Sequence, residues 1–250
     1  MRTQAFRDGD HGPLHTPEFR LLEWYRAHET WERLLDDCEG LLRACFSACG
    51  RGSRFAFGPH TVDISGPFER VQMDTAFARH AGFSLLETPD RASLEAAIRT
   101  HTAVHFEPDD TWDILFHRVF LNIVEPALLR NREKPLFLTH YPAQLAALAR
   151  LSPDDCRVAE RFELYVGGVE LANGFGELTD AAQQRQRFVE EKTHRLLAGH
   201  RDYPLDEDFL AVLPQIGSAA GIALGIDRLG MLVLNASHIE DAAPIAWSKS

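Results

Sequence analysis

Two glutamates on either side of a glycine pair are the residues of this sequence with the clearest capacity for chemistry. Alternating apolar residues flank Gly167–Gly168, a pattern typical of a β-hairpin with a two-residue turn. Such a turn places Tyr165 opposite Glu170. It also places Glu163 opposite Ala172, and the period-2 alternation of a strand then puts both glutamates and the tyrosine on one face.

Two carboxylates that are diagonal neighbours on a sheet repel each other, so a purely structural hairpin gains nothing from them. A bound cation would explain the pair, because Mg²⁺ is typically held by one or two carboxylates together with substrate phosphates. Glu163 and Glu170 are therefore candidate magnesium ligands. The alternative is that both carboxylates are solvated on an open face of the sheet, and the hairpin alone does not decide between the two interpretations.

The bulk composition is that of an ordinary globular protein with an acidic surface. The chain has 250 residues, 45% hydrophobic residues, 25% charged residues and a formal net charge of −11. This charge disfavours non-specific binding to nucleic acid, which needs a basic surface. No apolar run reaches the length of a membrane-spanning helix, and no signal peptide is evident at the N-terminus, so no membrane contact is expected. None of the four cysteines forms a Cys-x-x-Cys pair, and we expect a reduced, cytoplasmic protein.

Hydrophobic periodicity and turn residues predict the elements that must position these side chains. Loops are expected over 5–19 and, with one short strand, over 50–66. Strands are expected over 19–24, 136–139 and 221–226, with the hairpin at 161–175, and helices over 30–49, 75–80, 93–100, 110–124 and 180–198. Strands joined by hairpins or long helical excursions favour an α+β fold, an antiparallel sheet flanked by helices. No domain boundary is evident, so residues 1–250 are expected to form one domain.

Three separated segments together resemble the catalytic core of the class II aminoacyl-tRNA synthetases. Residues 6–19 resemble motif 2, residues 221–228 resemble motif 3, and residues 160–178 are similar to the lysyl-type sheet between them. A narrower resemblance is to the elongation factor P–lysine ligase family, which consists of truncated lysyl-tRNA synthetase relatives without an anticodon-binding domain. The strings that carry it are 22–26, 138–142, 148–155 and 223–229.

The resemblance implies an ATP- and Mg²⁺-dependent ligase. Such enzymes activate lysine or β-lysine as an aminoacyl-adenylate and transfer the acyl group to a lysine of elongation factor P, and no transfer RNA is expected as a partner. Two other hypotheses remain open at this point. One is an adenylate-forming ligase with a different acceptor, such as a carrier protein or a small amine. The other is a non-catalytic, synthetase-like regulatory domain that binds a nucleotide or an amino acid.

The same resemblance assigns roles around the nucleotide. Arg7 would contact the α-phosphate and Arg228 the γ-phosphate, which makes these two arginines the implied catalytic residues. Phe19 would stack on adenine, with Asp10 and His15 nearby in the ATP pocket. Glu163 and Glu170 would hold Mg²⁺, in agreement with the hairpin geometry.

The resemblance also assigns the amino-acid pocket. Glu23, Tyr25 and Glu177 match the positions that recognise the side-chain amine, and Asn173 would hold polar substrate atoms beside them. A buried ammonium group needs such counter-charge, since leaving it unpaired is costly. Ala223 stands where lysyl-tRNA synthetases have glycine and the elongation factor P ligases have alanine, so it favours the ligases.

Motif 1 of the class II core has no counterpart in this sequence, which starts almost at the residues that resemble motif 2. In the family that it resembles, motif 1 builds much of the dimer interface and braces the active site. We therefore expect an N-terminally shortened core, for which a homodimer is less expected than for the synthetases themselves.

Overall fold

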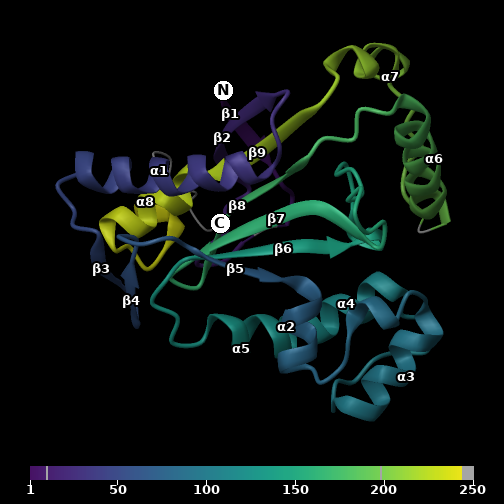
Figure 1. Ribbon diagram of the computed structural model, residues 1–250, viewed down its shortest axis with the longest axis horizontal. Coiled ribbons are helices and arrows are strands. Elements are labelled where there is room, and N and C mark those ends of the chain that lie inside the picture. The colour runs from purple at the N-terminus through teal and green to yellow at the C-terminus, as the bar shows by residue number, and fades with distance from the viewer. Residues whose placement is uncertain (10, 198, 244–250) are drawn as a thin grey trace.

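A mostly antiparallel sheet organises the chain, and a computed structural model describes it over residues 1–9, 11–197 and 199–243 (Figure 1). In these residues seven strands pair in the order β1-β2-β9-β8-β7-β6-β5, and only β5 and β6 run parallel. A separate two-stranded ribbon pairs β3 with β4. The strands are β1 (Arg2–Phe6), β2 (Glu18–Ala27), β3 (Arg54–Phe57), β4 (His60–Asp63), β5 (Glu69–Gln72), β6 (Leu136–Pro142), β7 (Val158–Val166), β8 (Val169–Gly176) and β9 (Ala219–Gly225).

Helices lie around the sheet in three groups. In Figure 1, α1 and α8 lie together on one side of the sheet, α2 to α5 form a group beside β5 and β6, and α6 with α7 stands at the opposite end from α8. The helices are α1 (Glu32–Ala48), α2 (Met73–His80), α3 (Arg91–His101), α4 (Trp112–Val119), α5 (Glu125–Leu129), α6 (Ala181–Leu197), α7 (Glu207–Val212) and α8 (Ile226–Leu234). This architecture is the predicted α+β fold, and the prediction is confirmed.

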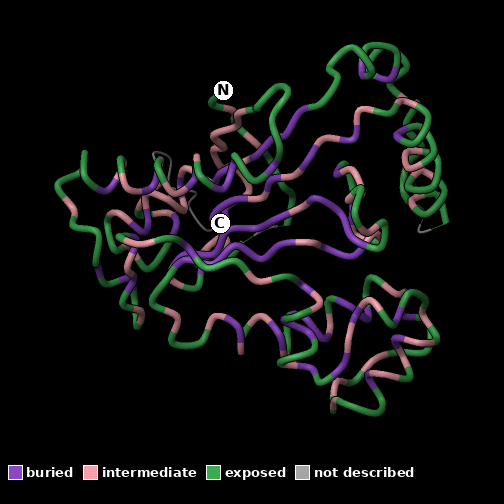
Figure 2. The backbone as a smooth tube through the Cα atoms, in the orientation of Figure 1, coloured by how far each residue is buried: buried purple, intermediate pink, exposed green. Residues whose placement is uncertain are grey.

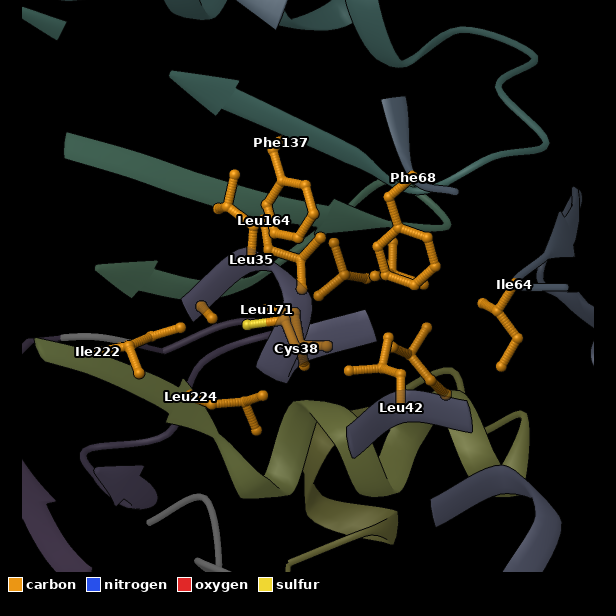
Figure 3. Packing of buried hydrophobic residues seen from close by; sticks show 14 of the residues in the cluster. Leu35, Cys38, Leu42, Ile64, Phe68, Phe137, Leu164, Leu171, Ile222 and Leu224 are labelled. Atoms are coloured by element: carbon orange, nitrogen blue, oxygen red, sulfur yellow. The ribbon is translucent and has the colours of Figure 1, made fainter. Parts of the chain in front are cut away.

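The larger apolar core lies between the sheet and α1. Helix α1 buries one stripe, which includes Leu35, Cys38 and Leu42, at the spacing expected of an amphipathic helix. Figure 3 shows these side chains packing with Ile222 and Leu224 of β9 and with residues of the neighbouring strands β6, β7 and β8. Figure 2 shows the consequence for the strands, because β7 is buried along almost its whole length whereas α6 is largely exposed. One face of the sheet is therefore closed by core packing on α1. On the other face a second apolar cluster packs β6 and β7 against the helices α2 to α5, and a cavity opens over β2, β8 and β9.

The glycine hairpin forms with the predicted turn but with a different register beyond it. Gly167 and Gly168 both have positive φ, 58° and 80°, as a type I′ turn requires. Tyr165 pairs with Glu170 as predicted, but Leu171 is an extra residue, a β-bulge. Glu163 consequently lies opposite Asn173, and the prediction of Ala172 opposite Glu163 was wrong. The physical reason is that Leu171 and Ala172 both pack into the core with α1.

Two further elements differ from the prediction. The last two residues of strand β1, Ala5 and Phe6, were predicted to begin a loop, and they are strand because β1 pairs along the edge of β2 through backbone hydrogen bonds. The helix predicted over 110–124 begins at Trp112 and continues through a π-helical turn, Phe120–Val124, into α5. Among the described residues, none of the helices is both long enough and apolar enough to cross a membrane.

We predict that Phe162→Ala destabilises the fold strongly. Phe162 is fully buried beneath the open face and its ring lies 5.8 Å from the rings of Trp31 and Phe137. Removing it leaves a cavity that should cost about 3–5 kcal/mol of unfolding free energy, measured from urea denaturation. Val189→Ala on the exposed surface of α6 is the control and should cost less than about 0.5 kcal/mol. Equal losses in the two variants would contradict this description of the core.

Candidate active site

The register of four neighbouring strands aligns four of the predicted site residues in one row. Glu23 of β2 pairs with Ala223 of β9, Ala223 pairs with Asn173 of β8, and Asn173 pairs with Glu163 of β7. Residues opposite each other in adjacent strands point to the same side of a sheet. The row therefore crosses the open face, opposite to the face that packs on α1.

The next row along the strands makes room for the predicted amine-binding residues. Tyr25 pairs with Gly221, and Gly221 pairs with Phe175. A Cβ atom at Gly221 would lie 2.1 Å from Oε1 of Glu177 and 2.6 Å from Cε1 of Tyr25. Glu177 and Tyr25 thus lie directly over the glycine backbone, and the absence of a side chain at Gly221 permits them to meet there.

A cavity of about 440 Å³ opens at the other end of the same face. It brings together residues of β2, β8, β9, α8 and the segment between β1 and β2. The predicted site residues that line it are Arg7, His15, Phe19, Glu170, Asn173, Ala223 and Arg228. Asn173 and Ala223 belong both to this cavity and to the row that contains Glu23, so they connect the arginine-lined end to the glutamate-lined end.

Arg228 is held in place by carbonyl groups from two other segments. Its Nη1 donates to the backbone oxygen of Glu170 at 2.6 Å, and its Nε donates to the backbone oxygen of Leu14 at 3.3 Å. Its Nη2 lies 2.8 Å from Nε2 of His15. Arg228 stands in the first turn of α8, so the helix N-terminus adds positive potential to the guanidinium group. This end of the cavity is prepared for an anion.

Arg7 and Phe19 lie at the outer part of the same cavity. The guanidinium carbon of Arg7 is 5.8 Å from the centre of the Phe19 ring, within the range of a cation–π contact. The backbone N–H of Arg7 donates to the carbonyl of Pro17 at 2.8 Å, which ties the arginine to the start of β2. The predicted partner Asp10 lies outside the residues that the structure describes.

The two hairpin carboxylates interact across the bulge, and their surroundings suit a divalent cation. Glu163 is buried, with Oε1 accepting from Arg161 at 2.9 Å and Oε2 accepting from the Tyr165 hydroxyl at 2.8 Å. Burial, and then the charge of Glu163, raise the pKa of Glu170. Among the described residues the Oδ1 atom of Asn173 is buried without a hydrogen-bond partner. A cation together with substrate phosphates would relieve the repulsion, and a substrate amine could donate to the unpaired oxygen of Asn173.

The glutamate-lined end of the face suits an organic cation, such as an ammonium group. Burial raises the pKa of Glu177 to about 7. Burial, and then the charges of Glu177 and Glu23, raise the pKa of Tyr25. Ionising a buried carboxylate is costly while the site holds no substrate, and an ammonium group placed beside the carboxylate stabilises its charged form. The arrangement can therefore recognise a substrate amine.

Several supporting residues were not found from the sequence. Arg20 binds the buried carboxylate of Asp227 through its backbone N–H and its Nε, each at 2.8 Å, and so locks β2 to the first turn of α8 next to Arg228. Gly221 was also missed as part of the site, and Tyr165 was predicted on the face of Glu163 and Glu170 but was given no role there. A lone arginine or glycine carries no recognisable spacing, so only the three-dimensional register identifies the roles of Arg20 and Gly221.

Known proteins are similar to this chain over almost its whole length. The family described as tRNA synthetases class II (D, K and N) matches residues 3–248. The chain belongs to this family. Three curated relatives are each named elongation factor P–(R)-β-lysine ligase. They come from Hamiltonella defensa (39% identity, 95% of this chain and 68% of the relative), Sodalis glossinidius (37%, 99% and 70%) and Edwardsiella ictaluri (38%, 98% and 69%).

Membership of the class II (D, K and N) synthetases, together with relatives that are named as ligases, identifies the chain as a ligase of this type and implies the use of ATP. The predicted resemblance is therefore confirmed. Apart from Asp10, the predicted site residues lie on one face of the sheet or on the segments and the helix end beside it.

We predict that Glu177→Gln makes the protein more stable at pH 8 but not at pH 5. The pKa of Glu177 is raised on folding, so the folded state binds the proton more tightly and loses stability as the pH rises towards about 7. The amide cannot ionise and removes this loss, which should raise Tm by about 2–4 °C at pH 8. The measurement is calorimetric Tm from pH 5 to pH 8.

Asp180→Asn is the control with the opposite sign. The N–H groups of Ala182 and Gln183 donate to Asp180 at the start of α6 and lower its pKa. Its stabilising effect is complete throughout this pH range, so the variant should lower Tm by a similar amount at pH 5 and pH 8. A pH-independent effect of Glu177→Gln would contradict the assignment of the raised pKa.

Proposed function

We propose that the protein activates (R)-β-lysine or lysine with ATP and transfers the acyl group to a lysine side chain of elongation factor P. The observation that carries the proposal is the charge order along one open face, with arginines at one end and carboxylates at the other. The relatives named elongation factor P–(R)-β-lysine ligase support the choice of amino acid and acceptor. Residues 1–250 would act as one catalytic domain.

In the first step an oxygen of the substrate carboxylate attacks the α-phosphorus of ATP and pyrophosphate leaves. Arg7 and Arg228 would stabilise the phosphate charge, with Phe19 beside the adenine ring. Bound Mg²⁺, held by Glu163 and Glu170, would supply further positive charge on the phosphates. Glu170 and Arg228 already share the cavity, which supports this division of roles.

In the second step an amine of the acceptor attacks the acyl carbon of the adenylate, a new amide bond forms and AMP leaves. Glu23 and Glu177 would hold the distal ammonium group of the substrate throughout both steps, and Asn173 would accept from its other amine. Anchoring the far end of the substrate fixes the position of the reacting carboxylate, and such positioning lowers the entropic part of the barrier.

Pyrophosphate exchange tests the proposal. We expect exchange into ATP that requires Mg²⁺ and is greater with (R)-β-lysine or lysine than with other amino acids. Arg228→Ala should lower kcat/KM by about 100-fold or more, because it removes charge stabilisation of the phosphates. Arg99→Ala, an exposed arginine of α3, should change it less than twofold. Absence of exchange with every basic amino acid in a folded preparation would contradict the proposal.

We also predict that Gly221→Ala weakens recognition of the substrate amine while the protein remains folded. The added Cβ atom would displace the carboxylate of Glu177 and the ring of Tyr25, which are both side-chain groups that can move aside. The KM for (R)-β-lysine should rise at least tenfold, with little change in the KM for ATP. Gly230→Ala in α8, whose Cβ atom meets that of Ala242 at 3.3 Å, is the control. A rise in both KM values for Gly221→Ala would indicate general damage instead.

A further inference from the structure

Arg161 is a charged residue of β7 that the proposed reaction does not use. It lies two residues before Glu163, so the alternation of a strand places the two side chains on the same face. The Arg161 side chain is 18% exposed and the Glu163 side chain is 10% exposed, and the two form an ion pair. Removing both partners from water costs more than their attraction returns, unless further hydrogen bonds hold them well. The other contacts of Arg161 therefore decide what the pair can do.

Three contacts with separate parts of the chain fix the guanidinium group of Arg161. Its Nη2 donates to Oε1 of Glu163 and its Nη1 donates to the backbone oxygen of Leu145, each at 2.9 Å. Its central carbon lies 4.5 Å from the centre of the Tyr141 ring, within the range of a cation–π contact. Tyr141 lies in β6 and is 3% exposed, and Leu145 ends the short 3₁₀ helix Ala143–Leu145 that follows β6. The guanidinium group therefore bridges β7 and the segment after β6.

This bridge fixes one oxygen of Glu163, and Tyr165 fixes the other. Oε1 of Glu163 accepts from Arg161, and Oε2 accepts from the Tyr165 hydroxyl at 2.8 Å. A carboxylate offers about four lone-pair positions, so two donors leave about two positions for a cation. The carboxylate is thus held in one orientation at both oxygens while it retains the capacity to bind a metal ion.

We propose that Arg161 is a positioning residue, which bridges Leu145 and Glu163 and so orients the Glu163 carboxylate for the divalent cation of the ATP complex. The inference rests on the proposed function, which assigns Glu163 and Glu170 as the carboxylates that hold Mg²⁺. The positive charge of Arg161 repels a cation and by itself lowers the metal affinity. Groups that orient a metal ligand, in contrast, commonly raise the metal affinity by about 10–100-fold. The sign of the change on removing Arg161 therefore separates positioning from simple charge compensation.

The test measures metal binding directly in the full chain. Mn²⁺ replaces Mg²⁺, and its dissociation constant is determined by electron paramagnetic resonance in the presence of a non-hydrolysable ATP analogue, with the analogue alone as the blank. Arg161→Gln removes the bridge and should weaken Mn²⁺ binding about tenfold. Binding of the analogue without metal should change less than twofold, since Arg161 does not line the nucleotide cavity. Arg157→Gln, an exposed arginine just before β7 that pairs with Asp155, is the control and should leave both quantities unchanged.

A second variant, Arg161→Lys, keeps the charge but lacks the planar fork that reaches both Glu163 and Leu145. It should also weaken Mn²⁺ binding, by at least about threefold, and it carries the test if Arg161→Gln does not fold. Unchanged or tighter Mn²⁺ binding by Arg161→Gln would overturn the proposal, as would full Mn²⁺ binding by Arg161→Lys. Failure of the unaltered protein to catalyse exchange with any basic amino acid is a different result, which would contradict the proposed function itself.

Discussion

The register of four antiparallel strands is the constraint on which the site depends. Because β2, β9, β8 and β7 pair with Glu23, Ala223, Asn173 and Glu163 in one row, side chains from distant parts of the sequence share one open face. A slip of one residue in any strand would turn its members of the row into the core. The burial of the opposite face against α1 prevents such a slip. The packing of the core therefore also fixes the positions of the site residues.

The bulge at Leu171 adjusts the register of β8 so that Asn173 joins the row of site residues. Without the extra residue, Glu163 would lie opposite Ala172, and Asn173 would leave the row. The bulge lets Leu171 and Ala172 both enter the core while Glu170 and Asn173 line the same cavity. The bulge thus interrupts the regular strand pairing and brings the polar side chains of Glu170 and Asn173 to the same cavity. β-Bulges often re-aim side chains in this way next to active sites.

The sequence predicts those parts of the structure that have short-range causes. The glycine turn at Gly167–Gly168 and the amphipathic stripe of α1 follow from residue type and spacing, and both are confirmed. The bulge depends on long-range packing that no local pattern encodes. The resemblance to the class II synthetases supplied most of the site residues, whereas Gly221 and the pair of Arg20 and Asp227 emerged only from the three-dimensional contacts.

We propose that one face of this sheet holds ATP and a diamino acid end to end. The most direct measurement is a crystal structure with a non-hydrolysable (R)-β-lysyl-adenylate analogue. The account predicts that the distal ammonium group lies about 3 Å from carboxylate oxygens of Glu23 and Glu177, with the phosphate position against Arg7 and Arg228. An analogue bound in the reverse direction, or bound away from this face, would contradict it.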